Sequence, residues 1–289
     1  MVGERVWCVK DALDWTVEYL ESKGIEQPRL SAEWLLSAAT GLSRVQVYAF
    51  HDRPLSETER AVLREGVRHR ATGAPLQYVT GEVAFRHIVL HIRPGAFIPR
   101  PETEVLVEEA LTVVRDIEQP IVLDLCTGSG CVALSIAREH PGARVWATEI
   151  STDAAAVARE NTTRLGLDDR VTILEGDLFV PVPGELRGRI DLVVSNPPYI
   201  PTSDLAALPS EVAGFEPGLA LDGGPDGLEI ARRILGEAPE WLAQNGALLM
   251  ELDEYRVQDA VKEMQPWYEG CKTVRDLAGR DRIATGYLR

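Results

Sequence analysis

From about residue 100 to the end of the chain, short apolar runs that suit buried strands alternate with longer segments that suit helices. The strand-like runs lie at 121–125, 143–149, 171–177, 190–196 and 247–252. The helix-like segments lie at 102–114, 132–138, 154–165 and 228–241, and the chain ends in further strand-like stretches. This alternation predicts an α/β fold with a parallel, doubly wound sheet, because parallel neighbours are joined through crossover helices.

The first 75 residues have a different pattern and indicate a small helical domain. Ser56 followed by Glu59 has the spacing of a capping box at a helix start. Ser31 follows a Pro-containing turn and is a second expected N-cap. The next segment is rich in β-branched and aromatic residues with Gly and Pro breakers, which predicts a β-hairpin linker. The expected division is a helical domain at 1–75, the linker at 76–98 and the α/β domain at 99–289.

Charge and composition argue against some classes of protein. The net charge is −15, whereas binding a phosphate backbone needs clustered Lys and Arg, so we expect no direct nucleic-acid substrate. An acidic surface suits a basic protein partner. No apolar run of about 18 residues is present, and the N-terminus is charged where a signal peptide needs an apolar core. We therefore expect a cytoplasmic protein without membrane contact, and a monomer.

The sequence carries no pattern of metal ligands. The four cysteines form no CxxC pair, and none lies near a histidine at ligand spacing. His87 and His91 share one face of an expected strand, but no further ligand is near them in sequence. We expect reduced thiols and no metal site.

A glycine-rich turn follows the first strand-like run. Gly128 and Gly130 let the backbone turn tightly and approach a ligand, and the next helix begins with free N–H groups. Glu149 ends the next strand, where a carboxylate can accept both hydroxyls of a ribose. This spacing also fits the dinucleotide fingerprint, so an NAD enzyme remains open at this point. Asp124 favours S-adenosylmethionine, because a carboxylate can meet its amino-acid end but would face a pyrophosphate unfavourably.

The segment Ser195-Asn-Pro-Pro-Tyr lies at the carboxyl end of a predicted strand, where doubly wound sheets bind ligands. An amide nitrogen is a poor nucleophile, because its lone pair is delocalised into the carbonyl group. The Asn196 side-chain oxygen and the Pro197 carbonyl oxygen can accept its two N–H bonds, position the nitrogen and favour its pyramidalisation. Tyr199 can stack on the planar amide and favour the cationic methyl group. The motif therefore predicts methyl transfer to an amide nitrogen from an already activated sulfonium, without a metal or a strong base.

These residues resemble the glutamine-N5 methyltransferases of the HemK/PrmC type, which modify peptide chain release factors. The likeness runs from about residue 75 to the C-terminus. It rests on PLQYVTG (75–81), FIPRPETE (97–104), LDLCTGSG (123–130), GDLF (176–179), VSNPPYI (194–200), LALDGGPDGL (219–228) and AGRDRIATG (278–286). NPPY alone also occurs in DNA adenine and ribosomal guanine methyltransferases, whereas FIPRPETE together with DGGPDGL is more specific.

Two segments depart from the pattern of that family. Cys126 stands where a glycine is usual in the cofactor loop, and we expect tolerance because only its backbone need contact the ligand. The stretch MELDEYRVQ (250–258) lacks the Gly that usually follows the strand-end Glu. We therefore expect a different loop conformation there.

The resemblance implies a Rossmann-like S-adenosylmethionine-dependent methyltransferase domain behind a small helical substrate-recognition domain. The implied substrate is the glutamine of a Gly-Gly-Gln loop in a release factor. The implied cofactor contacts are Cys126, Thr127, Gly128, Ser129 and Gly130 for the methionine part, Glu149 for the ribose, Asp177 and Leu178 for the adenine, and Asn196. The implied substrate contacts are Phe97, Asn196, Pro197, Pro198 and Tyr199, of which Asn196, Pro197 and Tyr199 carry the chemistry. Pocket roles for Arg100 and Glu102 stay open.

Three other functions remain to be separated from this one. A ribosomal-protein glutamine methyltransferase is the nearest alternative. A nucleic-acid adenine N6-methyltransferase belongs to another class, and the lack of a basic stripe argues against it. A non-catalytic binding module is the third, and the intact NPPY sequence argues against that.

Overall fold

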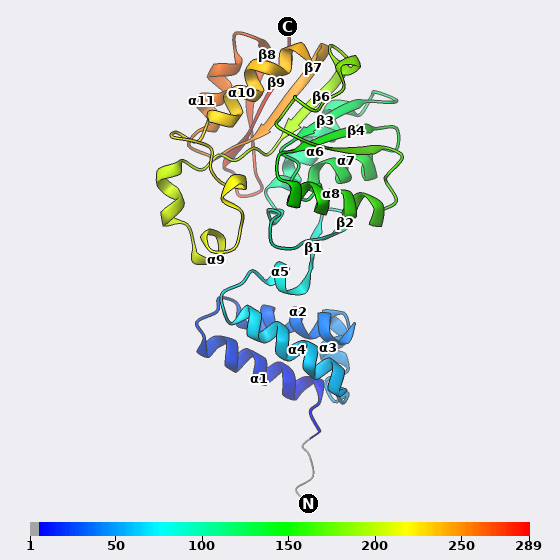
Figure 1. Cartoon of the computed structure of the whole chain (residues 1–289), viewed down its shortest axis with the longest axis vertical. Coiled ribbons are helices and arrows are strands. Elements are labelled where there is room, and N and C mark those ends of the chain that lie inside the picture. The colour runs from blue at the N-terminus through cyan, green and yellow to red at the C-terminus, as the bar shows by residue number, and fades with distance from the viewer. Residues whose placement is uncertain (1–5) are drawn as a thin grey trace, which may run out of the picture. The chain divides into compact units, whose positions relative to one another are not determined.

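A computed structural model describes residues 6–289 of the chain (Figure 1). These residues form two compact units. The helical unit comprises the residues up to Glu82 together with Ser210–Phe215, and the α/β unit comprises Val83–Pro209 and Glu216–Arg289. The first five residues of the predicted helical domain lie outside the described range. None of the described helices is long and apolar enough to cross a membrane.

The helical unit packs around one apolar core. Its helices are α1 (Val9–Ser22), α2 (Pro28–Thr40), α3 (Arg44–Ala49), α4 (Glu57–Arg70), α5 (Leu76–Thr80) and α9 (Ser210–Ala213). The buried side chains of Leu20, Leu36 and Val67 belong to this core. Each comes from a different helix, so helices that are polar on their outer faces bury their apolar stripes together.

One of the two predicted helix starts is confirmed. At α4 the backbone N–H of Ser56 donates to Glu59 Oε2 at 2.8 Å, and the Glu59 N–H donates to Ser56 Oγ at 3.2 Å. The prediction for Ser31 is wrong, because α2 begins three residues earlier at Pro28, and proline lacks the N–H that would need a cap there. Ser31 is instead buried inside α2, where its Oγ accepts a hydrogen bond from Arg70 Nε at 3.2 Å.

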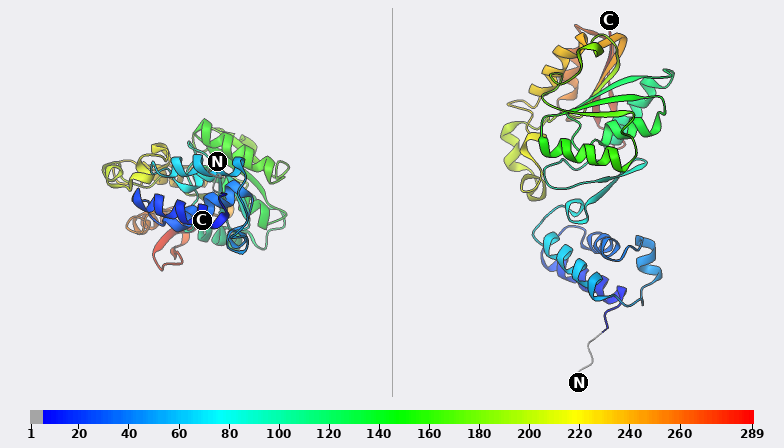
Figure 2. Two further views of the ribbon diagram at one scale, coloured as in Figure 1. Left: turned by 90° about the horizontal axis from the view of Figure 1, so that it is seen from below. Right: turned by 45° about the vertical axis from the view of Figure 1, so that its right-hand side comes forward.

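The α/β unit has the predicted Rossmann-like, doubly wound fold (Figure 2). Its strands are β3 (Ile121–Leu125), β4 (Arg144–Glu149), β5 (Val171–Glu175), β6 (Ile190–Ser195), β7 (Leu242–Glu251), β8 (Tyr268–Arg275) and β9 (Asp281–Leu288). Its helices are α6 (Thr103–Val114), α7 (Cys131–Glu139), α8 (Thr152–Arg164), α10 (Glu229–Glu237) and α11 (Val257–Met264). The sheet has seven strands in the order β5-β4-β3-β6-β7-β9-β8.

The last two strands depart from the all-parallel sheet that the sequence pattern predicts. β9 runs antiparallel to both β7 and β8. The segment between β8 and β9 is a tight turn in which Asp276 Oδ1 accepts the N–H groups of Ala278 and Arg280, each at 2.9 Å. Two strands joined by so short a turn can pair only as antiparallel neighbours.

Side chains that alternate along the central strands bury both faces of the sheet. Leu123 and Leu125 of β3 pack in the cluster that contains α10 and α11. Val122 packs in the opposite cluster with α6 and α7. Because both faces are covered, these strands are almost continuously apolar, which explains why the sequence shows runs instead of a strict alternation.

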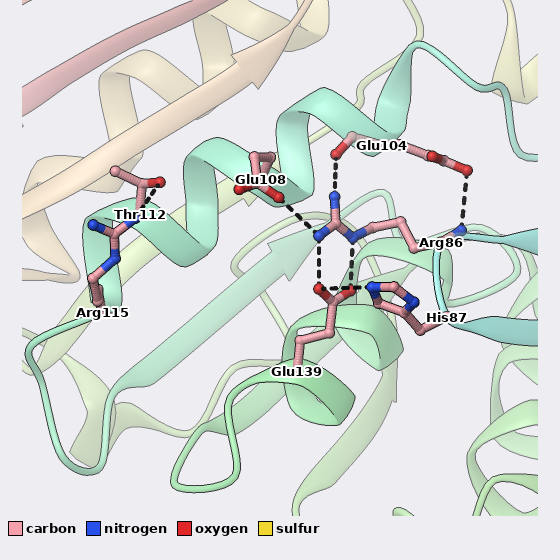
Figure 3. Close-up of polar contacts among 7 residues, drawn as sticks. All are labelled: Arg86, His87, Glu104, Glu108, Thr112, Arg115 and Glu139. Atoms are coloured by element: carbon pink, nitrogen blue, oxygen red, sulfur yellow. Dashed lines mark hydrogen bonds and ion pairs between the residues drawn. The ribbon is translucent and has the colours of Figure 1, made fainter.

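A two-stranded hairpin, β1 (Glu82–Phe85) and β2 (Ile88–His91), precedes α6. Its turn residue Arg86 is held against α6 and α7 (Figure 3). The Arg86 guanidinium forms two 2.6 Å bonds to the Glu139 carboxylate, a 2.9 Å bond to Glu108 Oε2 and a 3.0 Å bond to the Glu104 carbonyl oxygen. Arg86 lowers the pKa of Glu139, because the paired guanidinium favours the ionised carboxylate. One side chain therefore fastens the hairpin to two helices.

Candidate active site

The predicted site segments meet at the carboxyl ends of the central strands. The strand register pairs Leu125 of β3 with Ser195 of β6, and Ser195 with Met250 of β7. On the other side of β3, Leu125 pairs with Thr148 of β4. The residues that follow these positions therefore leave the sheet at one edge, beside the point where the strand order reverses. Open α/β sheets bind ligands at this point.

Asp124 holds the glycine-rich loop from inside the protein. The side chain is 1% exposed, and its Oδ2 accepts the Thr127 hydroxyl at 2.6 Å and the Ala133 N–H at 3.2 Å. Burial raises its pKa to about 7, and the two hydrogen bonds oppose that rise. This differs from the expectation that Asp124 faces the amino-acid end of a cofactor. The carboxylate shapes the loop that a cofactor would contact.

The loop backbone requires left-handed conformations. Cys126, Gly128 and Gly130 have φ angles of +58°, +58° and +87°. A Cβ built on Gly128 would meet nothing within 4 Å, so this residue borders open space. Burial raises the pKa of the Cys126 thiol, which keeps it in the neutral form. The loop thus offers backbone groups to a ligand and no charge of its own.

Asn161, on α8, ties this loop to the hairpin. Its Nδ2 donates to the carbonyl oxygens of Ser129 and His91, both at 3.0 Å, and its Oδ1 accepts the His91 N–H at 2.7 Å. The Ser129 hydroxyl is buried without a hydrogen-bond partner in the described part of the chain. Sequence reasoning missed Asn161, because its two partner residues come from segments that are far apart along the chain.

Glu149, at the end of β4, binds the glycine-rich loop through its carboxylate. It is 8% exposed, and its two oxygens accept the N–H groups of Gly128 and Ser151, each at 2.9 Å. Burial raises its pKa, while the backbone N–H groups lower it. A carboxylate has about four lone-pair positions, so acceptor capacity remains for ligand hydroxyls. Ile150, the next residue, is 51% exposed and adds an apolar surface that sequence reasoning missed.

The segment after β5 places Asp177 and Leu178 at the same edge of the sheet. Asp177 Oδ2 forms a 2.7 Å ion pair with Arg233 of α10. Leu178 is buried, with a φ of +45°. The carboxylate of Asp177 is thus already paired with Arg233. Part of the Asp177 side chain nevertheless stays exposed to solvent just after β5.

The NPPY segment leaves β6 directly at this edge. The Ser195 hydroxyl donates to the Leu125 carbonyl oxygen at 2.8 Å and links the two loops. Pro197 is buried, and Asn196 and Pro198 are partly exposed. Tyr199 packs against the apolar cluster that contains α10 and α11. Burial raises the pKa of its hydroxyl, so the side chain is neutral. The segment therefore carries no charge.

The DGGPDGL segment supports the NPPY segment through backbone contacts. The Ile200 N–H donates to the Leu221 carbonyl oxygen at 2.9 Å, and the Gly223 N–H donates to the Ile200 carbonyl oxygen at 2.8 Å. A Cβ on Gly227 would come within 2.3 Å of the Tyr199 carbonyl oxygen. These glycines therefore allow two backbones to lie in contact.

The FIPRPETE segment leads into α6. The Arg100 guanidinium lies 4.8 Å from the centre of the Phe97 ring and forms an ion pair with the buried Glu216. Glu216 also accepts the Ile98 N–H at 3.3 Å. Arg100 therefore fixes the Phe97 ring, whereas Glu102 is exposed.

Thr103 and Glu251 were not singled out in the sequence as site residues. The Thr103 hydroxyl accepts Asn196 Nδ2 at 3.1 Å. Glu251, at the end of β7, is 2% exposed, and burial raises its pKa to about 7. The 250–258 stretch, to which Glu251 belongs, turns at Asp253, whose Oδ1 accepts the Tyr255 N–H at 3.0 Å.

The histidines and cysteines are also candidate metal ligands. Among residues 6–289, no group of three or more His, Cys, Asp or Glu side chains could hold a metal ion. His87 and His91 each lie near a glutamate, at 3.8 Å from Glu139 and 3.9 Å from Glu160. The four cysteines are free thiols.

Comparisons with known proteins identify relatives over almost the whole chain. Residues 11–81 match the PrmC N-terminal domain, and residues 101–207 match the methyltransferase small domain. The release factor glutamine methyltransferase of Geobacter sulfurreducens is 44% identical over 285 residues, which cover 98% of each chain. The enzymes of the same name from Moorella thermoacetica and Rhodopirellula baltica are 42% and 40% identical, and the matches cover 97% of this chain and 99% and 96% of theirs.

Solved structures share the fold at much lower identity. The hMettl16 catalytic domain, in complex with an RNA hairpin, matches with a TM-score of 0.56 and 17% identity over 78% of this chain and 81% of that one. The Thermus thermophilus 16S rRNA N2 G1207 methyltransferase matches with a TM-score of 0.52 and 19% identity over 72% of this chain and 50% of that one. The near-full-length relatives are decisive, and the chain belongs to the release factor glutamine methyltransferase family.

Proposed function

We propose that this protein transfers a methyl group from S-adenosylmethionine to the side-chain amide nitrogen, N5, of the glutamine in the Gly-Gly-Gln motif of peptide chain release factors. The observation that carries the proposal is the 44% identity to a release factor glutamine methyltransferase over 98% of both chains. The Asn196–Tyr199 segment at the end of β6 supports it, because its groups suit an amide substrate.

S-adenosylmethionine supplies a methyl group that is already activated by the sulfonium. The open backbone at Gly128 and the spare acceptor positions of Glu149 fit such a ligand. We assign the methionine part to the loop from Cys126 to Gly130 and the ribose to Glu149. The adenine would lie by Asp177, Leu178 and the exposed side chain of Ile150.

The substrate amide needs positioning more than it needs a base. We assign its two N–H bonds to Asn196 Oδ1 and the Pro197 carbonyl oxygen, so that the nitrogen lone pair is directed at the methyl group. Tyr199 would stack on the amide plane, and Pro198 and Phe97 would line the pocket. Preorganised acceptors of this kind act without reorganisation during the reaction.

The helical unit is proposed to recognise the body of the release factor, and the methyltransferase is proposed to act as a monomer in the cytoplasm. The net charge of −15 supports a protein substrate over a nucleic acid. It also favours encounter with a basic surface.

The proposal is tested by incubating the protein with labelled S-adenosylmethionine and purified release factors, then mapping the modified residue by mass spectrometry. Label on the loop glutamine is expected, and none when that glutamine is replaced by glutamate, which cannot present two N–H donors. Label on ribosomal proteins alone, or on adenine in DNA or RNA, would replace this substrate with one of the alternatives.

A further inference from the structure

Asn196 works as an acceptor only when its side-chain amide points one way. Oδ1 and Nδ2 have nearly the same shape, so hydrogen-bond partners and not packing choose between the two orientations. With Oδ1 toward the substrate, Asn196 accepts an N–H bond. With Nδ2 there, it would repel the same N–H bond. A group behind Asn196 must therefore select the orientation.

Thr103 lies behind Asn196. It is the first residue of α6 and 1% exposed, and its Oγ1 accepts Asn196 Nδ2 at 3.1 Å. A hydroxyl group can donate or accept. Thr103 alone would thus tolerate either orientation, because it could equally donate to Oδ1 of a flipped amide.

Glu251 determines whether the Thr103 hydroxyl donates or accepts toward Asn196. Ser195 pairs with Met250, so Asn196, directly after β6, and Glu251, the last residue of β7, are the next residues along two parallel neighbours. Burial raises the pKa of Glu251, and the neighbouring Thr103 and Asn196 side chains lower it, which places both of them beside its carboxylate. Its Oε2 is buried without a partner in the part of the chain that the structure describes. In its ionised form the carboxylate only accepts, so the Thr103 proton is drawn to Glu251 and the Thr103 lone pairs remain for Nδ2. The protonated form, which predominates below its pKa of about 7, would donate to Thr103 instead, so the orientation of Asn196 is selected by the ionised form.

We propose that Thr103 and Glu251 are positioning residues for methyl transfer, in which the carboxylate orients the Thr103 hydroxyl and the hydroxyl holds Asn196 with Oδ1 toward the substrate amide. The inference rests on the proposed function of Asn196 as an acceptor. Thr103 and Glu251 act through Asn196 and have no proposed contact with the substrate.

Thr103→Val keeps the shape of the side chain and removes the hydroxyl. We expect kcat on a release factor to fall roughly 10- to 100-fold, because a misoriented group disrupts the reactive geometry. Affinity for S-adenosylmethionine should not change. Thr103→Ser, which keeps the hydroxyl, should recover most of kcat. Thr162→Val is the matched control, since it removes a buried hydroxyl that donates to the Ala158 carbonyl oxygen at 2.8 Å within α8.

Coupling to Asn196 separates positioning from a general structural role. In an Asn196→Ala background, Thr103→Val should cause no further loss of kcat, because the group that it orients is gone. Glu251→Gln should behave in the same way, since an amide can donate to Thr103 and reverse the chain of hydrogen bonds. Equal losses in both backgrounds, or wild-type kcat for Thr103→Val, would overturn the proposal.

A nuclear magnetic resonance measurement tests the arrangement without any methyl-transfer assay. The Asn196 side-chain NH2 signals, assigned by their loss in Asn196→Ala, should exchange slowly with water in the wild type and at least tenfold faster in Thr103→Val. Slow exchange in both would overturn the inference even if release factors are methylated. The expected change in exchange would support it even if they are not, which keeps the two proposals distinguishable.

Discussion

Gly223 lies so close to Tyr199 that a Cβ atom at position 223 would come within 2.7 Å of the Tyr199 Cα atom. The same Cβ would lie 2.8 Å from the Pro198 carbonyl oxygen. Neither neighbour is the end of a flexible side chain, so the NPPY backbone would have to move. The DGGPDGL segment therefore determines the position of the NPPY backbone at the end of β6.

Gly223→Ala should lower turnover by at least about tenfold, because overpacking of this kind costs roughly 1–3 kcal/mol and displaces the groups that grip the amide. Gly218→Ala is the control just before this segment, since a Cβ there meets nothing within 4 Å. Steady-state methylation of a release factor by both variants checks this. Equal activities would mean that the loop position is set elsewhere.

Glu149→Ala should weaken binding of S-adenosylmethionine by roughly 1.5–3 kcal/mol, the usual contribution of hydrogen bonds to a charged group. Glu175 pairs with Glu149 across β4 and β5 but is exposed, so Glu175→Ala should bind the cofactor like the wild type. Titration calorimetry measures both. Unchanged affinity in Glu149→Ala would assign the ribose to another group, and tight binding of NAD would contradict the cofactor assignment.

Asn196→Asp should keep or improve cofactor affinity while turnover falls on the order of a hundredfold. Aspartate keeps an acceptor oxygen and nearly the same shape, but it adds a negative charge beside the sulfonium. That charge stabilises the cation before transfer, and the cation is lost as the methyl group moves, so the barrier rises. Single-turnover methylation and cofactor binding on the same variant are the measurements. Near-normal turnover would leave Asn196 with a structural role only.

Arg86→Ala should destabilise the α/β unit by roughly 3 kcal/mol, because it leaves the largely buried Glu139 carboxylate without its guanidinium partner. Arg86 and Glu139 side chains are 12% and 16% exposed, whereas the Lys262–Asp259 pair is 71% and 57% exposed, so Lys262→Ala should cost less than about 1 kcal/mol. Urea unfolding at pH 7 measures both differences.

The effect of Arg86→Ala should also depend on pH. The folded-state pKa of Glu139 is depressed, so its stabilising contribution is present above the unfolded value, 4.5, and is lost as the pH falls through the folded value. The difference between wild type and Arg86→Ala should therefore shrink as the pH is lowered below about 4. A difference that stays constant would show that the lost packing of Arg86, and not its charge, was responsible.

Local patterns in the sequence predicted much of the fold. The run at 121–125 and the glycines after it are contiguous, so their strand and turn could be read directly, and Glu149 follows from the length of one strand–helix–strand unit. The Ser56–Glu59 cap likewise depends on residues three positions apart. Ser31 failed because a proline and a serine both mark helix starts, and only packing decides between them.

Contacts between distant segments could not be predicted in this way. Asn161 joins His91 to Ser129, and Thr103 joins α6 to the NPPY segment, across separations that no periodicity encodes. Gly223 carries a φ that any residue adopts, so only its neighbours explain why it is a glycine. The burial of Asp124 could not be predicted either. Its carboxyl group was expected to meet a ligand, and it instead accepts hydrogen bonds from Thr127 and Ala133 of the loop and helix.

The helical unit is not a single stretch of chain. It takes in Ser210–Phe215, so the polypeptide passes between the two units three times, and the Arg70 guanidinium, on a side chain 6% exposed, reaches Glu211 at 3.2 Å. A fragment that stopped at Glu82 would leave that buried cation without its carboxylate. Exchanging this unit between relatives to transplant substrate preference would thus require grafting two segments together. A recombination breakpoint near the hairpin alone would produce mismatched chimaeras.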